Sequence, residues 1–199
     1  MAVTRGSFRQ VGVALRALGI LTVVLGIGYT ALITGIGQLA LPQQSNGSLV
    51  TVGERTVGSS LIGQSFTTSK GVALARWFQS RPSATNYDGG ASSGSNYGPN
   101  SPALVKLIQQ RLASIEKSDG VTAAQIPADA LTASGSGLDP DISPAYALLQ
   151  VDRVAAARGL PVSAVKALVE SKIQGRELGF LGEPTVNVLE LNIALAKLK

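Results

Sequence analysis

The longest stretch of this 199-residue chain without a charged side chain lies between Arg16 and Glu54. Within it, the 25 residues 17–41 are mostly Leu, Ile, Val, Ala and Gly. As a helix they would be about 37 Å long, enough to cross the roughly 30 Å hydrocarbon core of a bilayer with some tilt. The sequence therefore predicts a membrane-spanning helix over residues 17–41.

The charges in front of this helix predict its orientation. Arg5, Arg9 and Arg16 precede it, and no acidic residue does. Because positive charge stays on the cytoplasmic side of a membrane, we expect residues 1–16 to form a cytoplasmic arm. Residues 42–199 would then form one extracytoplasmic domain.

A cleaved secretory signal is the competing interpretation of the apolar segment. The apolar region of such signals is about 7–15 residues long, so this one is too long, and the small-residue cleavage candidate at 38–40 is poor. The absence of cysteine excludes a lipoprotein, which needs one for acylation. We therefore expect an uncleaved anchor.

Small residues recur along the predicted anchor. Thr22, Gly26, Thr30 and Thr34 are four residues apart and would share one side of a helix. Small side chains allow close helix approach in lipid, where packing drives association. This spacing predicts a helix partner in the membrane.

Composition limits what the remaining 158 residues can do. Three of the 17 basic residues lie in the arm, which leaves 14 against 12 acidic residues, and there is a single tryptophan. A nearly neutral domain without a basic block is a poor nucleic-acid binder. Cysteine and histidine are both absent, which excludes disulfides, Cys/His zinc sites, Ser-His-Asp triads and Cys-His dyads.

Residues 42–101 carry weak signals. Short strands are expected at Ser48–Val52 and Ser65–Phe66, and a helix over Lys70–Phe78. Residues 80–99 are polar, with Asn-rich turns and two tyrosines. A loop of this length inside a compact domain is usually disordered or functional, and this composition favours an ordered binding loop.

The second half of the chain is helical. Ser-Pro pairs, an N-cap followed by proline at the first helical position, start two helices, one ending near Lys117 and one closed by Gly159. A third is expected over Ser163–Ile173, with Val165, Leu168 and Val169 buried. Asn187 and Glu190 have capping-box spacing and would open a last helix through Leu198. The predicted domain is α+β with helices dominant.

Residues 131–144 are rich in Gly, Ser, Asp and Pro. Asp139, Asp141 and Ser143 have the 1-3-5 spacing of a calcium loop, but Pro144 stands where that loop needs Gly, and Gln150 where it needs Glu. The nearby glycine pair lacks the rest of any phosphate-binding fingerprint. On residue chemistry this segment is a tight turn that leads into a capped helix.

Catalytic motifs are weak. Ser114–Lys117 and Ser163–Lys166 match S-x-x-K, but no K-T-G motif follows. Asn46–Ser48 is a glycosylation pattern that has meaning only in a eukaryotic secretory pathway. No spacing pairs any two of Asp88, Asp129, Asp139 and Asp141. Enzymatic activity has no support, and a membrane-anchored enzyme or solute-binding domain stays open as the alternative.

Five ordered blocks give the chain a specific resemblance. Behind a single N-terminal anchor, and over essentially the whole length, the chain resembles the C subunit of the Kdp potassium-transporting ATPase (the KdpC family). Tyr97, where a Leu-like residue is expected, is a minor departure. The blocks are Phe78–Ala84, Gly94–Pro99, Thr132–Pro144, Arg153–Ala155 and Asn187–Asn192.

The resemblance implies an accessory, non-catalytic subunit of a bacterial inner-membrane potassium uptake pump. Its partners would be a potassium-channel-like A subunit, a P-type ATPase B subunit and a small F peptide. The C subunit is needed for assembly and is described as a catalytic chaperone that raises the ATP affinity of the B subunit. ATP and potassium would be handled by the complex, and the chain alone would bind no cofactor. The implied nucleotide candidates are Ser134, Gly135, Ser136, Gly137 and Gln150.

That description conflicts with the orientation predicted by the arginines, because ATP is hydrolysed in the cytoplasm. We therefore expect the domain to cap the potassium entrance from outside and to act on ATP affinity allosterically. The expected contact surface combines the 81–99 loop, the 134–143 turn and the small-residue face of the anchor. Its residues are Thr22, Gly26, Thr30, Thr34, Arg81, Pro82, Ser83, Ser95, Asn96, Gly98, Asp139 and Asp141.

Overall fold

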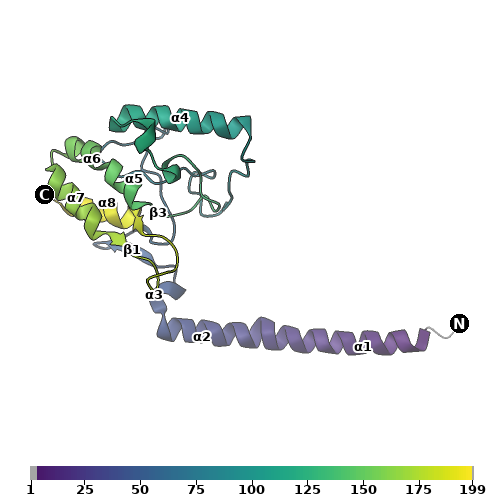
Figure 1. Cartoon of the computed structure of the whole chain (residues 1–199). Helices are drawn as coiled ribbons and strands as arrows, with labels where there is room; N and C mark the ends of the chain where they lie inside the picture. The colour runs from purple at the N-terminus through teal and green to yellow at the C-terminus, as the bar shows by residue number, and fades with distance from the viewer. Residues whose placement is uncertain (1–3, 199) are drawn as a thin grey trace. The chain divides into compact units, whose positions relative to one another are not determined.

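The computed structural model describes residues 4–198, with side chains from Phe8 onward. The chain forms two compact units that meet near Leu49. The first unit is a helical segment, and the second is the C-terminal domain, residues 50–199 (Figure 1).

The first unit is one long apolar helix followed by a short turn. It consists of α1 (Thr4–Leu21), η1 (Thr22–Tyr29), α2 (Thr30–Ala40) and α3 (Pro42–Ser45). Residues Phe8–Ala40 form a helix long and apolar enough to cross a membrane, with a mean hydropathy of 2.1 over an 18-residue window. This is the one candidate span in the part of the chain that the structure describes. The helix starts well before residue 17, so residues 17–41, which were predicted to span the membrane, are only part of it.

The middle of this helix is not α-helical. η1 is a π-helix, with hydrogen bonds between residues five apart, and the Thr30 hydroxyl donates to the carbonyl of Leu25 at 3.4 Å. The methyl of Thr22 lies 3.8 Å from where a Cβ on Gly26 would be, so these two residues share one side of the helix. No side chain of the span is buried in the part of the chain that the structure describes.

The C-terminal domain begins with the paired strands β1 (Leu49–Val52) and β2 (Arg55–Ser59), which confirms the predicted strand at 48–52. The other two weak predictions here were wrong. Ser65–Phe66 is irregular, and a single bridge pairs Thr67 with Ala73 instead. Residues 70–78 form no helix and consist mainly of turns. The side-chain amide of Gln79 donates to the backbone carbonyls of Phe66, Leu74 and Trp77, and these bonds hold the segment in its non-helical path.

The predicted helices of the second half are confirmed. Gly159 ends α6 in the left-handed conformation, and the Asn187 side chain accepts from the backbone N–H of Glu190 at the start of α8. The helix expected after Ser143 is divided at Gln150 into two pieces. The helices are α4 (Pro102–Asp119), η2 (Ala123–Gln125), η3 (Ala128–Ala130), α5 (Pro144–Leu149), α6 (Val151–Arg158), α7 (Val162–Ser171) and α8 (Val188–Lys197).

A small antiparallel sheet ties the helices together. Its central strand is β5 (Thr185–Asn187), flanked by β3 (Asp141–Ile142) and β4 (Ile173–Gln174). Helix α7 contacts α5, α6 and α8, and α4 lies against α6 (Figure 1). The observed class is therefore α+β with helices dominant, as predicted.

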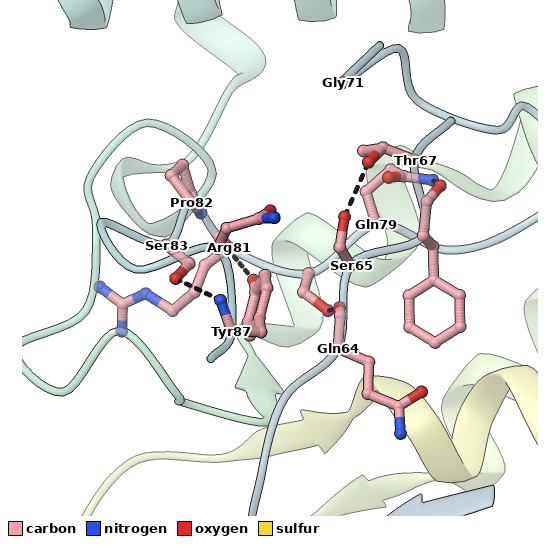
Figure 2. A pocket seen from close by; sticks show the side chains of 12 residues that line it. Gln64, Ser65, Thr67, Gly71, Gln79, Arg81, Pro82, Ser83 and Tyr87 are labelled. Carbon is pink, nitrogen blue, oxygen red and sulfur yellow. Dashed lines mark hydrogen bonds between the residues drawn. The ribbon is translucent and has the colours of Figure 1, made fainter. Parts of the chain in front are cut away.

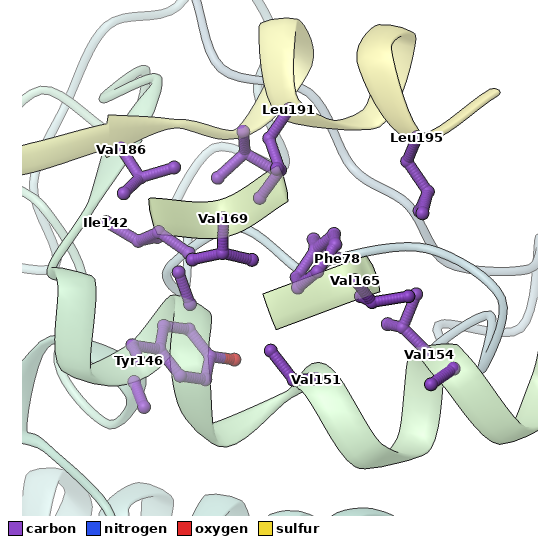
Figure 3. Close-up of a cluster of buried hydrophobic side chains, with 14 of the residues drawn as sticks. Phe78, Ile142, Tyr146, Val151, Val154, Val165, Val169, Val186, Leu191 and Leu195 are labelled. Carbon is purple, nitrogen blue, oxygen red and sulfur yellow. The ribbon is translucent and has the colours of Figure 1, made fainter. Parts of the chain in front are cut away.

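The core lies between these helices and the sheet (Figure 3). Val165 and Val169 of α7, predicted as buried, are fully inaccessible, whereas Leu168 is only partly buried. Phe78 is also fully buried, although it comes from the irregular segment. Its backbone N–H and carbonyl both bond to the side chain of Asn192 on α8, at 2.9 and 3.0 Å. One asparagine therefore fixes this segment against the core.

A buried ion pair makes a second link between distant segments. Arg153 on α6 bonds Asp119, the last residue of α4, at 2.7 Å, and both side chains are less than a tenth exposed. The same guanidinium donates to the carbonyls of Ala75 and Trp77 and to the side chain of Gln150. Because its donors are used in this way, the charge is tolerated away from water.

Candidate functional site

The two segments predicted to form a contact surface lie together. The Ser83 hydroxyl donates to the carbonyl of Gly137 at 2.7 Å. The backbone N–H of Ser93 donates to the carbonyl of Ser136 at 2.9 Å, and the Ser92 hydroxyl donates to the same carbonyl. We call the combined surface, residues 80–99 and 132–143, the loop face. Its two parts are joined mainly by bonds to backbone carbonyls.

Gly137 is the tightest point of the loop face. Its φ is +68°, and a Cβ there would lie 2.6 Å from the Thr85 hydroxyl and 2.7 Å from the carbonyl of Ser93. Any other residue would push the 81–99 loop away from the turn. The buried hydroxyl of Ser134 accepts from the Gly137 N–H at 2.8 Å and closes the turn, which confirms the tight-turn interpretation.

Arg81 and Asp139 make an ion pair across the loop face. The guanidinium lies 2.8 Å from the carboxylate, and the two side chains are 23% and 29% exposed. The other oxygen of Asp139 accepts from the backbone N–H of Asp141 at 3.0 Å. Both side chains therefore stabilise the domain itself, because the ion pair connects the start of the 81–99 loop to the 134–143 turn.

Asp141 is held in a less favourable setting. Burial and the neighbouring charge of Asp139 raise the pKa of its carboxyl, which the hydrogen bond from the Asn187 amide at 3.2 Å partly opposes. The same Asn187 amide donates to the carbonyl of Ser60 at 2.8 Å. Asp141 thus links the turn to the central strand.

Two residues that the sequence did not assign to the site organise it. Tyr87 donates its hydroxyl to the carbonyl of Arg81, and burial raises its pKa to about 12. Tyr87 and its neighbour Asn86 have φ of +60° and +52°, so the loop holds two residues in a strained conformation. Asp129 accepts from both the N–H and the hydroxyl of Ser143, at 2.7 and 2.9 Å. Its only sequence signal was its acidity.

A polar pocket of about 240 Å³ opens beside Tyr87 (Figure 2). Many of its polar groups already bond within the protein. The Ser65 and Thr67 hydroxyls bond each other, and the Ser80 hydroxyl donates to the carbonyl of Gln64. The pocket is lined by residues of the loop face together with residues from the preceding segment 64–79.

The remaining contact candidates differ in exposure. Ser95, Asn96 and Gly98 are exposed, Pro82 and Ser83 are half-buried, and Asn96 has a φ of +53°. The outer part of the 81–99 loop is thus available for contact, whereas its inner part fastens it. Thr22, Gly26, Thr30 and Thr34 of the anchor are exposed in the isolated chain.

The nucleotide candidates fall into two groups. Gly135 and Ser136 are exposed, while Ser134, Gly137 and Gln150 are buried. The side-chain oxygen Oε1 of Gln150 accepts from the backbone N–H of Gln79 and from Arg153, and its side-chain amide donates to the backbone carbonyls of Gln79 and Tyr146. These four bonds use the donors and the acceptor of the side chain within the fold.

Groups that carry chemistry are sparse. Among residues 4–198, no three His, Cys, Asp or Glu side chains gather in a way that could hold a metal ion. The loop face offers instead a fixed surface of hydroxyls, amides and backbone groups.

Known proteins are similar in sequence to nearly the whole length of this chain. Residues 11–197 match the family model for KdpC, the c chain of the K⁺-transporting ATPase. The potassium-transporting ATPase KdpC subunit of Methylococcus capsulatus is 48% identical over 189 residues, 94% of this chain and 96% of that protein. The KdpC subunit of Herpetosiphon aurantiacus is 50% identical over 94% and 95% of the two chains. That of Gemmatimonas aurantiaca is 52% identical over 89% and 87%.

Proposed function

The chain belongs to the KdpC family of potassium-transporting ATPase subunits, and from this membership we propose that it is a non-catalytic subunit that caps the pump from outside the membrane. Its partners would be the channel-like A subunit, the P-type ATPase B subunit and the small F peptide. Family membership favours a pump subunit over the alternative interpretation, a free-standing anchored enzyme or solute-binding domain.

The charge in front of the anchor supports the proposed orientation. Arg5, Arg9 and Arg16 precede the uncharged segment 17–41, and no acidic residue balances them. The arm of residues 1–16 is then cytoplasmic, residues 17–41 lie in the inner membrane, and residues 42–199 are periplasmic or extracellular.

The loop face is the observation that supports a contact between the domain and the channel-like subunit. Residues 80–99 contain no helix or strand, yet their hydrogen bonds to the turn hold them in one conformation. A surface that is already ordered loses little conformational entropy on binding. Ser95, Asn96 and Gly98 are its exposed outer residues and would meet the partner.

Any effect on ATP would be indirect. Gln150 and Ser134 are occupied inside the fold, which argues against their contacting nucleotide. The subunit would raise the ATP affinity of the B subunit by binding one state of the complex better than another. ATP and potassium would be bound by the complex, and this chain would hold neither alone.

A matched pair of substitutions tests the loop face. We expect Ser95→Trp, at an exposed position of the loop, to lower the yield of A and B subunits recovered with tagged chain, or to raise the KM for ATP of the recovered complex. Ala167→Trp, exposed on α7 outside the loop face, is the control and should behave as wild type. Equal yield and equal KM for the two variants would contradict the proposed contact.

A further inference from the structure

The most exposed apolar cluster of the C-terminal domain lies outside the loop face. It is at the end of the hairpin that joins β4 to β5, where Leu178 is 80% exposed, Phe180 68% and Leu181 49%. Large apolar side chains gathered on a protein surface usually mark an interaction site. We call these three residues the hairpin tip.

The backbone holds the hairpin tip in a defined shape. Glu177 and Leu181 bond each other through both backbone pairs, at 3.0 and 2.9 Å, and the Gly179 N–H donates to the carbonyl of Arg176. Below this small turn, Arg176 and Glu183 form an ion pair at 2.5 Å. The tip is therefore a closed turn, built on strands that continue into the core sheet.

The turn also contains an unfavourable backbone conformation. Leu178 has a φ of +52°, in the left-handed region that is unfavourable for a residue with a Cβ. Its neighbour Gly179 has a φ of +81°. A strained backbone that also exposes a leucine side chain to water does not stabilise the fold of this chain. It is typical of a segment whose side chains are used elsewhere.

The charge of the hairpin distinguishes between a lipid and a protein occupant. Between residues 173 and 187 there is one basic residue, Arg176, and two acidic ones, Glu177 and Glu183, giving a net charge of −1. Elements that insert into the surface of anionic membranes carry lysine and arginine around their apolar residues. The hairpin has the opposite sign, which favours a protein.

From these observations we propose that the hairpin tip inserts into an apolar pocket with a basic rim on another protein subunit of the same pump. The pocket would receive Phe180 and the two leucines, and the basic rim would meet Glu177, because Glu183 is already paired with Arg176. The inference rests on the proposed function, in which the C-terminal domain meets its partners from outside. It adds a second contact that the loop face does not contain.

Site-specific crosslinking tests this contact in the assembled pump. A photoreactive phenylalanine analogue replaces Phe180 in full-length chain expressed with the other subunits, and the same analogue at Val162, exposed at the start of α7, is the control. We expect Phe180 to give a crosslink to another pump subunit and Val162 to give none. Crosslinks from Phe180 only to lipid, only to a second copy of this chain, or to nothing would each overturn the proposal.

A polar variant measures the contribution of the tip. Leu178→Ser with Phe180→Ser should lower the amount of recovered complex about tenfold or more, as expected when a buried aromatic anchor is lost from an interface. Because both side chains are exposed, the unfolding midpoint of the chain alone should not fall, which separates lost contact from lost folding. Unchanged recovery would overturn the proposal.

The same analogue at Ser95 separates the two contacts. A partner crosslink from Ser95 without one from Phe180 would leave the loop-face contact in place and overturn the hairpin tip. A partner crosslink from Phe180 without one from Ser95 would support the hairpin tip and contradict the loop-face contact.

Discussion

The helical half of the C-terminal domain (α5–α8) and its loop face are both ordered, but by different interactions. Valines and leucines of the helices, such as Val165, Val169 and Leu195, are fully buried against one another. In the loop face, serine hydroxyls and backbone N–H groups bond to carbonyls such as those of Ser136 and Gly137. Apolar packing tolerates exchange of similar side chains, whereas these bonds depend on individual polar groups in fixed positions. Substitutions in the two regions should therefore fail in different ways.

The largest effect is expected in the core, where Phe78 from the irregular segment lies in one cluster with the buried residues of the helical half. Phe78→Ala removes a fully buried ring, and such truncations cost about 3–5 kcal/mol of unfolding free energy. Urea unfolding of the full chain in detergent, followed by circular dichroism, measures this loss. Val72→Ala, at a residue that is 62% exposed in the same segment, is the control. Similar values for the two variants would mean that Phe78 does not anchor the segment.

A glycine substitution should break the loop face while the helical half stays folded. Gly137→Ala forces a Cβ against the Thr85 hydroxyl and the Ser93 carbonyl, with an expected cost of about 1–3 kcal/mol. The released loop should be cut faster by chymotrypsin at Tyr87 and Tyr97. Gly135→Ala is the matched control, because a Cβ there meets nothing within 4 Å. Equal cleavage rates in the two variants would argue against the close approach.

Alkaline pH should weaken the loop face through Tyr87. Burial raises the pKa of its phenol from 10.0 to about 12, so its contribution to stability is complete below pH 10 and is lost as the pH rises towards 12. Burial raises the pKa of Tyr146 in the same direction, so Tyr87→Phe should reduce this alkaline loss without abolishing it.

At neutral pH the Tyr87→Phe variant should be less stable than wild type by about 1 kcal/mol, because its hydrogen bond to the carbonyl of Arg81 is gone. Unfolding midpoints measured between pH 7 and pH 12 test both effects. An alkaline loss identical to that of wild type would show that Tyr87 does not titrate as the structure indicates.

The smallest effect is a gain in stability. The pKa of Asp141 is raised chiefly by burial and then by Asp139, so folding favours the protonated carboxyl. Its charged form therefore costs stability once the pH exceeds the raised pKa, and this cost disappears in acid. Asp141→Asn should raise the unfolding midpoint slightly at pH 7 and leave it unchanged near pH 3. A lower midpoint at pH 7 would mean that the carboxylate itself is needed.

The same contrast explains what the sequence could predict. Helix starts at the Ser-Pro pairs and the stop at Gly159 depend on neighbouring residues, so they could be read from the sequence and were confirmed. The helix predicted over 70–78 was wrong because the path of that segment is set by Gln79 and by Asn192, which lies 114 residues from Phe78. A local pattern holds no information on such a partner.

The candidate site shows the same limit. The resemblance indicated both halves of the loop face through blocks rich in Gly, Ser, Asn and Pro. It could not indicate that Arg81 and Asp139 pair with each other, nor that Tyr87 and Asp129 organise the surface, because these contacts form only in the folded domain. The π-helical turn of the anchor, η1, likewise had no sequence signal that distinguished it from an α-helix.

The orientation of the C-terminal domain is the central claim, and labelling of a single cysteine tests it most directly. The chain has no cysteine of its own, so Ala167→Cys introduces one target on the exposed side of α7, outside both proposed contacts. A small, charged maleimide that does not cross the inner membrane is added to intact cells expressing the whole pump, and Ser7→Cys in the N-terminal arm is the control. The account predicts that Ala167→Cys is labelled in intact cells and Ser7→Cys only after permeabilisation. The reverse pattern would contradict it.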